Sequence, residues 1–403
     1  MCLSADPNKH NSSSLYEIPV KSIFILRPDN LGDAVLFSGT LSHIRTFYDE
    51  AEITLCVKKY AHNLFEKCPY IDKIVTWEDL AEPLPKWLPP FWGRGSLETI
   101  IWWVFYRRTV LRNYQWDLFL LPVRSPNYRM HLFALAAKAK AKYAILGDLS
   151  NQLKWIDKKA DHIYTSKLYI SDDWEKEHEL NINLEFLKIL GLGVNSEDIW
   201  PEIWTTPEDE EWAKKNVIKI NHSLTVAVCP GIISDAAKFY PAHFYAEAFS
   251  KLKNVKINAV IFGSKAEIVQ CNEVNNFLAK CEQVINVKNL AGLSTVRQLA
   301  EGLRACDIVI ANETAALHIA VALHKPTIGI IGGGHFGRFY PWGDPAINRA
   351  ASHTMNCFGC NWQCQYSKIR CIQEIEPQSV AQQFERILRI ITSEDDRSEN
   401  LHE

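Results

Sequence analysis

The stretch that decides the fold is residues 311–334, ANETAALHIAVALHKPTIGIIGGG. An apolar strand ends near Asn312, a helix that carries His318 follows, and a second apolar strand begins after Pro326. In an open parallel sheet, ligands bind beyond the carboxyl ends of the strands, where helix N-termini present free N–H groups. The stretch therefore predicts an α/β fold with an anion site, of a kind that suits a phosphorylated ligand.

Strands and helices alternate along most of the chain, which is typical of a doubly wound α/β fold. The expected strands cover residues 21–26, 53–57, 71–75, 116–121, 143–145, 224–229, 257–262, 284–287, 307–311 and 327–331. The expected helices cover residues 31–47, 61–67, 131–138, 175–190, 242–251, 265–280, 295–305, 315–324 and 377–391. Two such runs joined by a linker predict two Rossmann-like domains that face a cleft.

Length also favours two domains, because 403 residues exceed what a single hydrophobic core usually holds. Residues 191–207, with Gly, Asn, Ser and two prolines, are the best linker candidate. The predicted division is a disordered polar tail at 1–20, an N-terminal domain at 21–205 with a Trp- and Arg-rich insert at 80–112, a C-terminal domain at 206–375, and a final helix with an acidic tail at 376–403.

Composition excludes several classes of protein. The formal net charge of −3 argues against a general nucleic-acid binder. No apolar run reaches the ~18 residues that span a bilayer, and the polar first twenty residues do not resemble a secretory signal. Eleven cysteines in such a chain indicate reduced thiols and a cytoplasmic location.

The turn at residues 28–33, PDNLGD, lies between a buried strand and a helix. Gly32 permits close approach of the backbone, and Asp33 falls in the first turn of the helix. Two interpretations stay open from position alone: Asp33 is a base at the mouth of the cleft, or it only complements the helix dipole.

Two further segments carry candidate ligand contacts. Gly231 and the small residues of the loop at 229–238 suit backbone N–H groups that meet an anion, and Lys238 supplies a point charge of the kind used for phosphates. The alternative for Lys238 is a surface lysine before a helix. His318, in the helix after residues 312–314, is the second candidate, and the alternative for it is a histidine of the hydrophobic core. Residues 332–337, GGGHFG, match a dinucleotide fingerprint only formally, because no helix start follows them.

A cysteine cluster lies after the last expected strand, with the spacing C-x2-C-x3-C-x6-C. Its members are Cys357, Cys360, Cys364 and Cys371. Four thiols fit a structural zinc site, although the spacing is not that of a standard finger. The alternative is free thiols that pack a loop.

The insert at 80–112 contains the apolar run IIWWVFY at 100–106, followed by Arg107, Arg108 and Arg112. Aromatic residues beside arginines suit the surface of an anionic membrane. The alternative is a core helix with a solvated basic end.

Five motifs in order make the chain resemble the heptosyltransferase-type glycosyltransferases, family 9 of the sugar-nucleotide glycosyltransferases. The resemblance covers nearly all of residues 21–391. The motifs are 27–33 (RPDNLGD), 229–241 (CPGIISDAAKFYP), 263–267 (GSKAE), 291–294 (AGLS) and 312–318 (NETAALH).

The resemblance implies a GT-B architecture, with the acceptor on the first Rossmann-like domain, the nucleotide sugar on the second, and a C-terminal helix that crosses back. It also implies an inverting transfer that needs no metal. By position, Asp33 is similar to the base that deprotonates the acceptor hydroxyl, and Lys238 to the group that neutralises the donor diphosphate. The remaining expected donor contacts are Gly231, Glu267 at the ribose, the N–H groups around Thr314 and Ala315, and Glu313 and His318 at the sugar diphosphate.

The implied function is transfer of a sugar, heptose or related, from a nucleotide sugar such as ADP-heptose to a lipopolysaccharide-like or other lipid-linked envelope glycan. The enzyme would act at the inner face of the cytoplasmic membrane. The family usually has Asp-Thr-Gly where this chain has Glu313, Thr314 and Ala315, so the donor sugar stays open. The alternatives are a sugar-nucleotide epimerase of the same architecture and an inactive sugar-nucleotide-binding or scaffold protein.

Overall fold

The computed structural model describes most of the chain. The described residues are 19–81, 111, 114–147, 161–170, 177–231 and 238–399. The predicted tail and nearly all of the predicted insert lie outside them.

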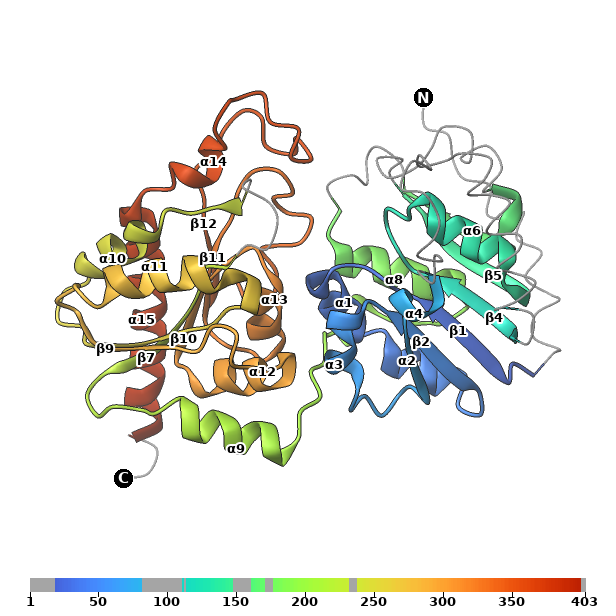
Figure 1. Ribbon diagram of the computed structural model, residues 1–403, viewed down its shortest axis with the longest axis horizontal. Helices are drawn as coiled ribbons and strands as arrows, with labels where there is room; N and C mark the ends of the chain where they lie inside the picture. Colours follow the sequence, from blue (N-terminus) through green and yellow to red (C-terminus); the bar gives the residue numbers. More distant parts are fainter. Residues whose placement is uncertain are drawn as a thin grey trace, which may run out of the picture.

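Two six-stranded parallel sheets form the two halves of the molecule (Figure 1). The first sheet has the order β3-β2-β1-β4-β5-β6. Its strands are β1 (Ser22–Leu26), β2 (Glu52–Val57), β3 (Lys73–Thr76), β4 (Gln115–Leu121), β5 (Lys138–Leu146) and β6 (Ser166–Tyr169). The second sheet has the order β12-β11-β10-β7-β8-β9. Its strands are β7 (Leu224–Cys229), β8 (Ile257–Ile261), β9 (Val284–Asn289), β10 (Ile308–Asn312), β11 (Thr327–Ile330) and β12 (Asn348–Ala351).

The central strands are apolar at most positions because both faces of each sheet are covered. Along β1, Ile23 and Ile25 enter one hydrophobic cluster, whereas Phe24 and Leu26 enter another. Strand β10 divides its side chains between two clusters in the same way. This burial on both faces explains why continuous apolar runs, rather than alternating ones, marked these strands in the sequence.

Helices and short 3-10 turns connect the strands. In the first half these are α1 (Leu31–Ser38), α2 (Leu41–Phe47), η1 (Lys59–Ala61), α3 (His62–Phe65), α4 (Trp77–Ala81), α6 (Tyr128–Ala136), η3 (Asp161–Ile163) and α8 (Glu179–Ile189). The segment that leads to the second half contains η5 (Ser196–Asp198) and α9 (Pro207–Asn216). The second half has α10 (Ala242–Ser250), η7 (Lys265–Glu267), α11 (Ile268–Leu278), α12 (Val296–Ala305), α13 (Ala315–Ala322), α14 (Arg370–Gln373) and α15 (Pro377–Glu399).

Both sheets have the same strand order when each is counted from its own first strand. That order is 3-2-1-4-5-6, so the first and fourth strands of each half are neighbours. The connections leave these two strands toward opposite sides, which opens a crevice at their carboxyl ends. The topology therefore places the functional loops after β1 and β4 in one half, and after β7 and β10 in the other.

Several predicted elements were wrong in detail. The helix predicted over 31–47 is two helices, because a Cβ at Gly39 would lie 2.4 Å from the carbonyl oxygen of Trp200, whose segment packs there. The Lys-Ala repeat that begins at Lys138 is the start of β5, not the end of a helix. The short strands β6 and β12 were not predicted.

The two halves touch through α1 and α13, which belong to one hydrophobic cluster. Helix α15 packs against α10, β11 and β12, so the described contacts of this helix lie within the second half. The division at residues 205 and 206 stays a prediction. None of the helices in the described part of the chain is long and apolar enough to cross a membrane.

Candidate active site

A cleft of about 1660 Å³ lies between the loops of the two halves. It contains every residue that the sequence predicted for catalysis or donor binding. These are Asp33, Gly231, Lys238, Glu267, Glu313, Thr314, Ala315 and His318. The structure thus brings together residues up to 285 positions apart (33 to 318), although their roles stay predictions.

Asp33 lies in the first turn of α1, on the wall that the first half contributes. Burial raises the pKa of Asp33, and the nearby carboxylates of Asp29 and Glu179 raise it further, to about 7, against the opposing effect of Arg27 and Arg338. A carboxyl group with a pKa near the working pH is well suited to accept a proton. The local electrostatics therefore support the base rather than a mere complement to the helix dipole.

A buried arginine at the end of β1 gathers the carboxylates that raise this pKa, although its own charge opposes the rise. The Arg27 side chain is fully buried, and its Nε lies 3.0 Å from a carboxylate oxygen of Asp29. Its Nη2 lies 3.1 Å from Oε1 of Glu179 and donates to the backbone carbonyl of Asp33 at 3.4 Å. Three carboxyl groups thus share a small volume with one guanidinium, which pairs with the carboxylates of Asp29 and Glu179 and contacts Asp33 through its backbone carbonyl.

Lys238 faces Asp33's wall from the second half. Its Nζ lies 3.5 Å from Oε2 of Glu313, donates to the Glu313 carbonyl at 3.4 Å, and lies 5.4 Å from the centre of the Trp362 ring. Glu313 is buried, and burial raises the pKa of its carboxyl group despite the opposing charge of Lys238. A phosphate group that entered here would meet an ammonium group already held at the carboxyl end of β10.

Asn312 holds this corner together and was not predicted as a site residue. It is fully buried at the end of β10, and its Nδ2 donates to the carbonyls of Pro230 and Lys238, each at 3.1 Å. Its Oδ1 accepts a hydrogen bond from the Tyr245 hydroxyl at 2.7 Å. A polar residue that ends an otherwise apolar strand was the available signal in the sequence.

Glu267 is held against the loop that follows β7. One of its oxygens accepts a hydrogen bond from the Ser264 N–H at 2.6 Å, within a capping box at η7. A Cβ at Gly231 would lie 2.3 Å from the Glu267 carboxyl group, so only glycine leaves room for this carboxylate. The second oxygen is available to accept hydrogen bonds from a ligand's hydroxyl groups.

Helix α13 begins at the floor of the cleft. Its N-cap residue, Thr314, makes no side-chain hydrogen bond to the first turn, so the N–H groups at Ala315 and Ala316 are not capped by it. The helix also carries His318, whose Nδ1 accepts from the Trp342 indole N–H at 3.1 Å. Burial lowers the pKa of His318 to about 3. The neutral ring therefore carries its proton on Nε2, where it can donate but cannot act as an acid near neutral pH.

The loop after β11 supplies residues that the sequence did not single out. His335, Arg338 and Phe339 line the cleft, and Trp362 lines it from the loop after β12. In the described stretch between β11 and β12 no helix follows the glycine-rich segment, so the segment lacks the helix start that a dinucleotide fingerprint has. Two contacts tie this loop to α8: the Glu179 N–H donates to the Arg338 carbonyl at 2.9 Å, and His178 Nε2 bonds the Phe339 carbonyl at 3.0 Å.

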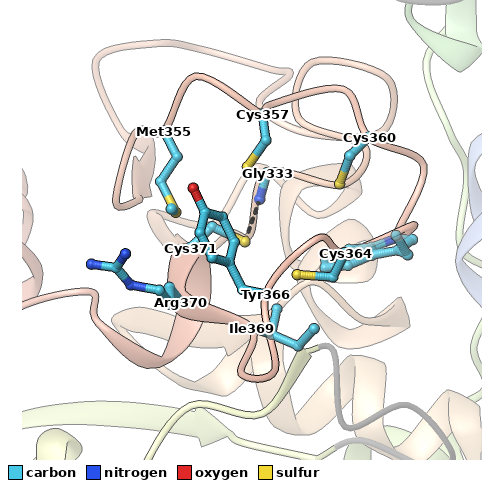
Figure 2. A pocket seen from close by; sticks show the side chains of 10 residues that line it. Gly333, Met355, Cys357, Cys360, Cys364, Tyr366, Ile369, Arg370 and Cys371 are labelled. Atoms are coloured by element: carbon cyan, nitrogen blue, oxygen red, sulfur yellow. Dashed lines mark hydrogen bonds between the residues drawn. The ribbon is translucent and has the colours of Figure 1, made fainter.

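The cysteine cluster lies beside this cleft, and Trp362 lines both the cleft and the cavity of the cluster. The four predicted ligands line a separate cavity of about 10 Å³, and the Cys371 sulfur accepts a hydrogen bond from the Gly333 N–H at 3.3 Å (Figure 2). Among the residues that the structure describes, no three Cys, His, Asp or Glu side chains are arranged to hold a metal ion. The structural zinc stays a prediction. In this structure the four residues are free cysteines.

Comparison with known proteins assigns the family. The model of glycosyltransferase family 9 (heptosyltransferase) matches residues 133–368, which is more than half of the chain. The chain belongs to glycosyltransferase family 9. The expected membership is thereby confirmed.

Sequence relatives agree with this membership. The chain is 22% identical to lipopolysaccharide heptosyltransferase 2 of Escherichia coli over 324 residues, which cover 77% of this chain and 82% of that protein. It is 29% identical to lipooligosaccharide heptosyltransferase 2 of Campylobacter jejuni over 166 residues, which cover 40% of this chain and 50% of that protein. The latter match thus spans about half of the relative.

A solved structure supports the fold. The family 9 glycosyltransferase from Veillonella parvula superposes with a TM-score of 0.69 at 16% identity, over 92% of this chain and 98% of that one. At this identity the likeness speaks for the fold alone. Together with the two parallel sheets, it confirms the expected GT-B architecture.

Proposed function

We propose that this family 9 protein is an inverting glycosyltransferase that moves heptose, or a related sugar, from a nucleoside-diphosphate sugar to a lipopolysaccharide-like acceptor. One observation carries the proposal. The cleft places a carboxyl group whose pKa is raised to about 7, Asp33, opposite a wall built for an anion, with Lys238 and the start of α13.

The transfer is a single displacement. Asp33 takes the proton from the acceptor hydroxyl while that oxygen attacks the anomeric carbon of the sugar. The new C–O bond forms on the face opposite the nucleoside diphosphate, the old C–O bond breaks, and its electron pair leaves with the diphosphate. Attack from the opposite face inverts the anomeric configuration.

Negative charge develops on the diphosphate as it leaves. Lys238 supplies a fixed positive charge there, because its ammonium group is held by Glu313 and its backbone carbonyl accepts a hydrogen bond from the Asn312 side chain. The uncapped N–H groups of α13 and the helix dipole add to it. Because these groups act on the leaving diphosphate, we propose that the step needs no metal ion.

The other donor contacts follow from geometry. Glu267 is placed to accept hydrogen bonds from ribose hydroxyls, with Gly231 leaving the space for its carboxylate. Glu313 presents a buried carboxylate whose Oε2 lies 3.5 Å from Lys238 Nζ, which suits a sugar hydroxyl next to the diphosphate. His318 offers an Nε2–H donor. By the names of its relatives, an ADP-heptose is the first donor to test. Other sugar nucleotides should also be tested, because Glu313 is longer than the Asp that the family usually has at this position.

Two arms test the proposal. In the binding arm, nucleoside diphosphates and their sugars are screened by thermal shift, since a ligand at a hundredfold excess over its Kd stabilises the folded state by about 2.7 kcal/mol. In the activity arm, release of nucleoside diphosphate is followed with a truncated lipopolysaccharide as acceptor. Donor-specific stabilisation and acceptor-dependent release support transfer. Turnover of the donor to an epimer without an acceptor would support the epimerase instead, and binding without turnover would support the inactive protein.

A further inference from the structure

Glu179 is a buried carboxylate that neither the family motifs nor the proposed chemistry uses. Its side chain is 1% exposed, and it is the first residue of α8, 152 positions from Arg27 in sequence. Its Oε1 lies 3.1 Å from Arg27 Nη2, whereas its Oε2 lies 3.8 Å from Arg124 Nη1 and accepts no hydrogen bond. A buried charge is usually retained only where it is paired, so the two arginines beside Glu179 are part of the reason that it can be a buried carboxylate.

Two elements that contact α8, the loop after β11 and helix α1, fix the position of this carboxylate. Its own backbone N–H donates to the Arg338 carbonyl, in the loop after β11 of the other half. Helix α8 also packs on α1, the helix that carries Asp33, where Asn183 Nδ2 donates to the Leu36 carbonyl at 3.2 Å. The Glu179 carboxylate therefore has a defined place relative to both walls of the cleft.

Arg27 transmits that position to the turn that ends in Asp33. The same Nη2 atom that pairs with Glu179 also donates to the Asp33 carbonyl, and Nε pairs with Asp29 at the start of the turn. The guanidinium group is planar and rigid, so fixing one edge of it fixes the groups on the other. Without Glu179, Arg27 would keep its contacts to the turn but lose its anchor on α8.

We propose that Glu179 is a positioning residue for sugar transfer, which holds Arg27 and through it the turn of residues 27–33, so that the Asp33 carboxylate faces the acceptor. The inference rests on the proposed function and adds to it a residue that does not touch the substrate. Small displacements of a reacting group are costly, on the order of 10²-fold for 1 Å.

The arrangement also has an electrostatic signature. The charged or titratable groups that act on Asp33 are Asp29 and Arg27 from its own turn, Glu179 from α8, and Arg338 from the loop after β11. Tyr60 faces it from η1, and burial together with Asp33 raises the pKa of that phenol. Because the negative charge of Glu179 raises the pKa of Asp33, its removal should lower that pKa. A residue that merely packed α8 onto α1 would leave the pKa unchanged.

The test compares Glu179→Gln, which removes the charge but keeps the shape, with the control Asn183→Ala. The control removes a buried polar contact between the same two helices without a change in charge. Two readouts are taken: kcat for transfer from an ADP-sugar as a function of pH, and the pKa of Asp33 from ¹³C NMR of the aspartate carboxyl groups, with Asp33→Asn for assignment. Glu179→Asp is a third variant, because it keeps the charge and shortens the reach to Arg27.

Glu179→Gln should lower kcat about 10- to 100-fold, with donor affinity unchanged, and should lower the pKa of Asp33 by about 1 unit. Asn183→Ala should lower Tm but leave the Asp33 pKa in place. If Glu179→Gln does not fold, Glu179→Asp should show a reduced kcat with a nearly normal pKa. Normal turnover in either Glu179 variant, or an unchanged Asp33 pKa in Glu179→Gln, would overturn the inference.

Failure of the proposed function gives a different pattern. If the wild-type protein transfers sugar from no donor, the function fails, while the NMR titration still decides whether Glu179 controls Asp33. If Asp33→Asn abolishes transfer and Glu179→Gln behaves like Asn183→Ala, the function stands and Glu179 is only structural.

Discussion

The two walls of the cleft come from sheets with the same strand order but place different groups at the strand ends. The wall of the first half collects Asp29, Asp33 and Glu179 around one buried arginine, and the result is a carboxyl group that is ready to take up a proton. The wall of the second half presents Lys238 and the start of α13, and it suits an anion. The comparison teaches that the topology fixes only where the loops meet. The side chains after β1 and after β10 decide which wall handles the proton and which handles the phosphate.

The largest effect should come from the first wall. Asp33→Asn should lower kcat by ~10²–10⁴-fold, which is the usual contribution of general-base assistance. Binding of a nucleoside diphosphate, measured by calorimetry, should not change, because that ligand contacts the other wall. Normal turnover in the Asn variant would remove the distinction between the walls.

Lys238→Ala should act on the second wall alone. We expect loss of a charge-assisted contact to phosphate, which is roughly 1.5–3 kcal/mol, for a nucleoside diphosphate but not for the nucleoside. The exposed Lys253→Ala is the matched control for loss of a positive charge in the same half. Equal losses for nucleoside and diphosphate would show that Lys238 does not contact the phosphates.

The insert at 80–112 belongs to the first half by sequence. The proposed acceptor is anchored in lipid, so contact of the insert with a membrane would support the assignment of the acceptor to that half. Each basic residue near an anionic leaflet adds about 1 kcal/mol. The protein should therefore sediment with anionic vesicles at low salt and be released at high salt. Replacing Arg107, Arg108 and Arg112 with glutamine should abolish this without unfolding. Wild-type protein that ignores such vesicles would indicate a core or acceptor-pocket element.

The cysteine cluster should have the smallest effect on transfer. It lines its own cavity in the second half, next to the cleft, and none of its four thiols lines the cleft. Elemental analysis of the purified protein decides whether the four thiols hold zinc, and mild chelation should leave kcat unchanged while the fold is intact. Immediate loss of activity with an unchanged circular dichroism spectrum would place the cluster in the chemistry.

Local sequence predicted the central strands of both sheets and the segments that line the cleft. The strand β7 was predicted at its observed bounds, and both strand-end motifs that carry Asp33 and Glu313 face the cleft. These predictions succeeded because apolar strands and the turns after them are encoded by neighbouring residues.

What the sequence did not reveal depends on distant contacts. Glu179 acquires its meaning only from Arg27, on another element, and nothing next to it in the chain marks it as part of a site. Strand β12, with the sequence NRAA, is too short and polar to stand out, and forms because β11 offers it a parallel edge. The break at Gly39 likewise arises from the segment around Trp200 that packs against it.

The most direct test of the two-wall account is the pH dependence of kcat for transfer at saturating donor. Asp33 acts in its ionised form, and its pKa is raised to about 7, so the rate should be highest above that pH and should fall as the pH drops through it. The fall should approach tenfold per pH unit well below the pKa, as expected for a single essential base. The residual rate of Asp33→Asn should lack this limb. A wild-type rate that stays constant from about pH 8 down to about pH 5, near the ordinary range of a carboxyl group, would contradict the assignment of Asp33 as the base.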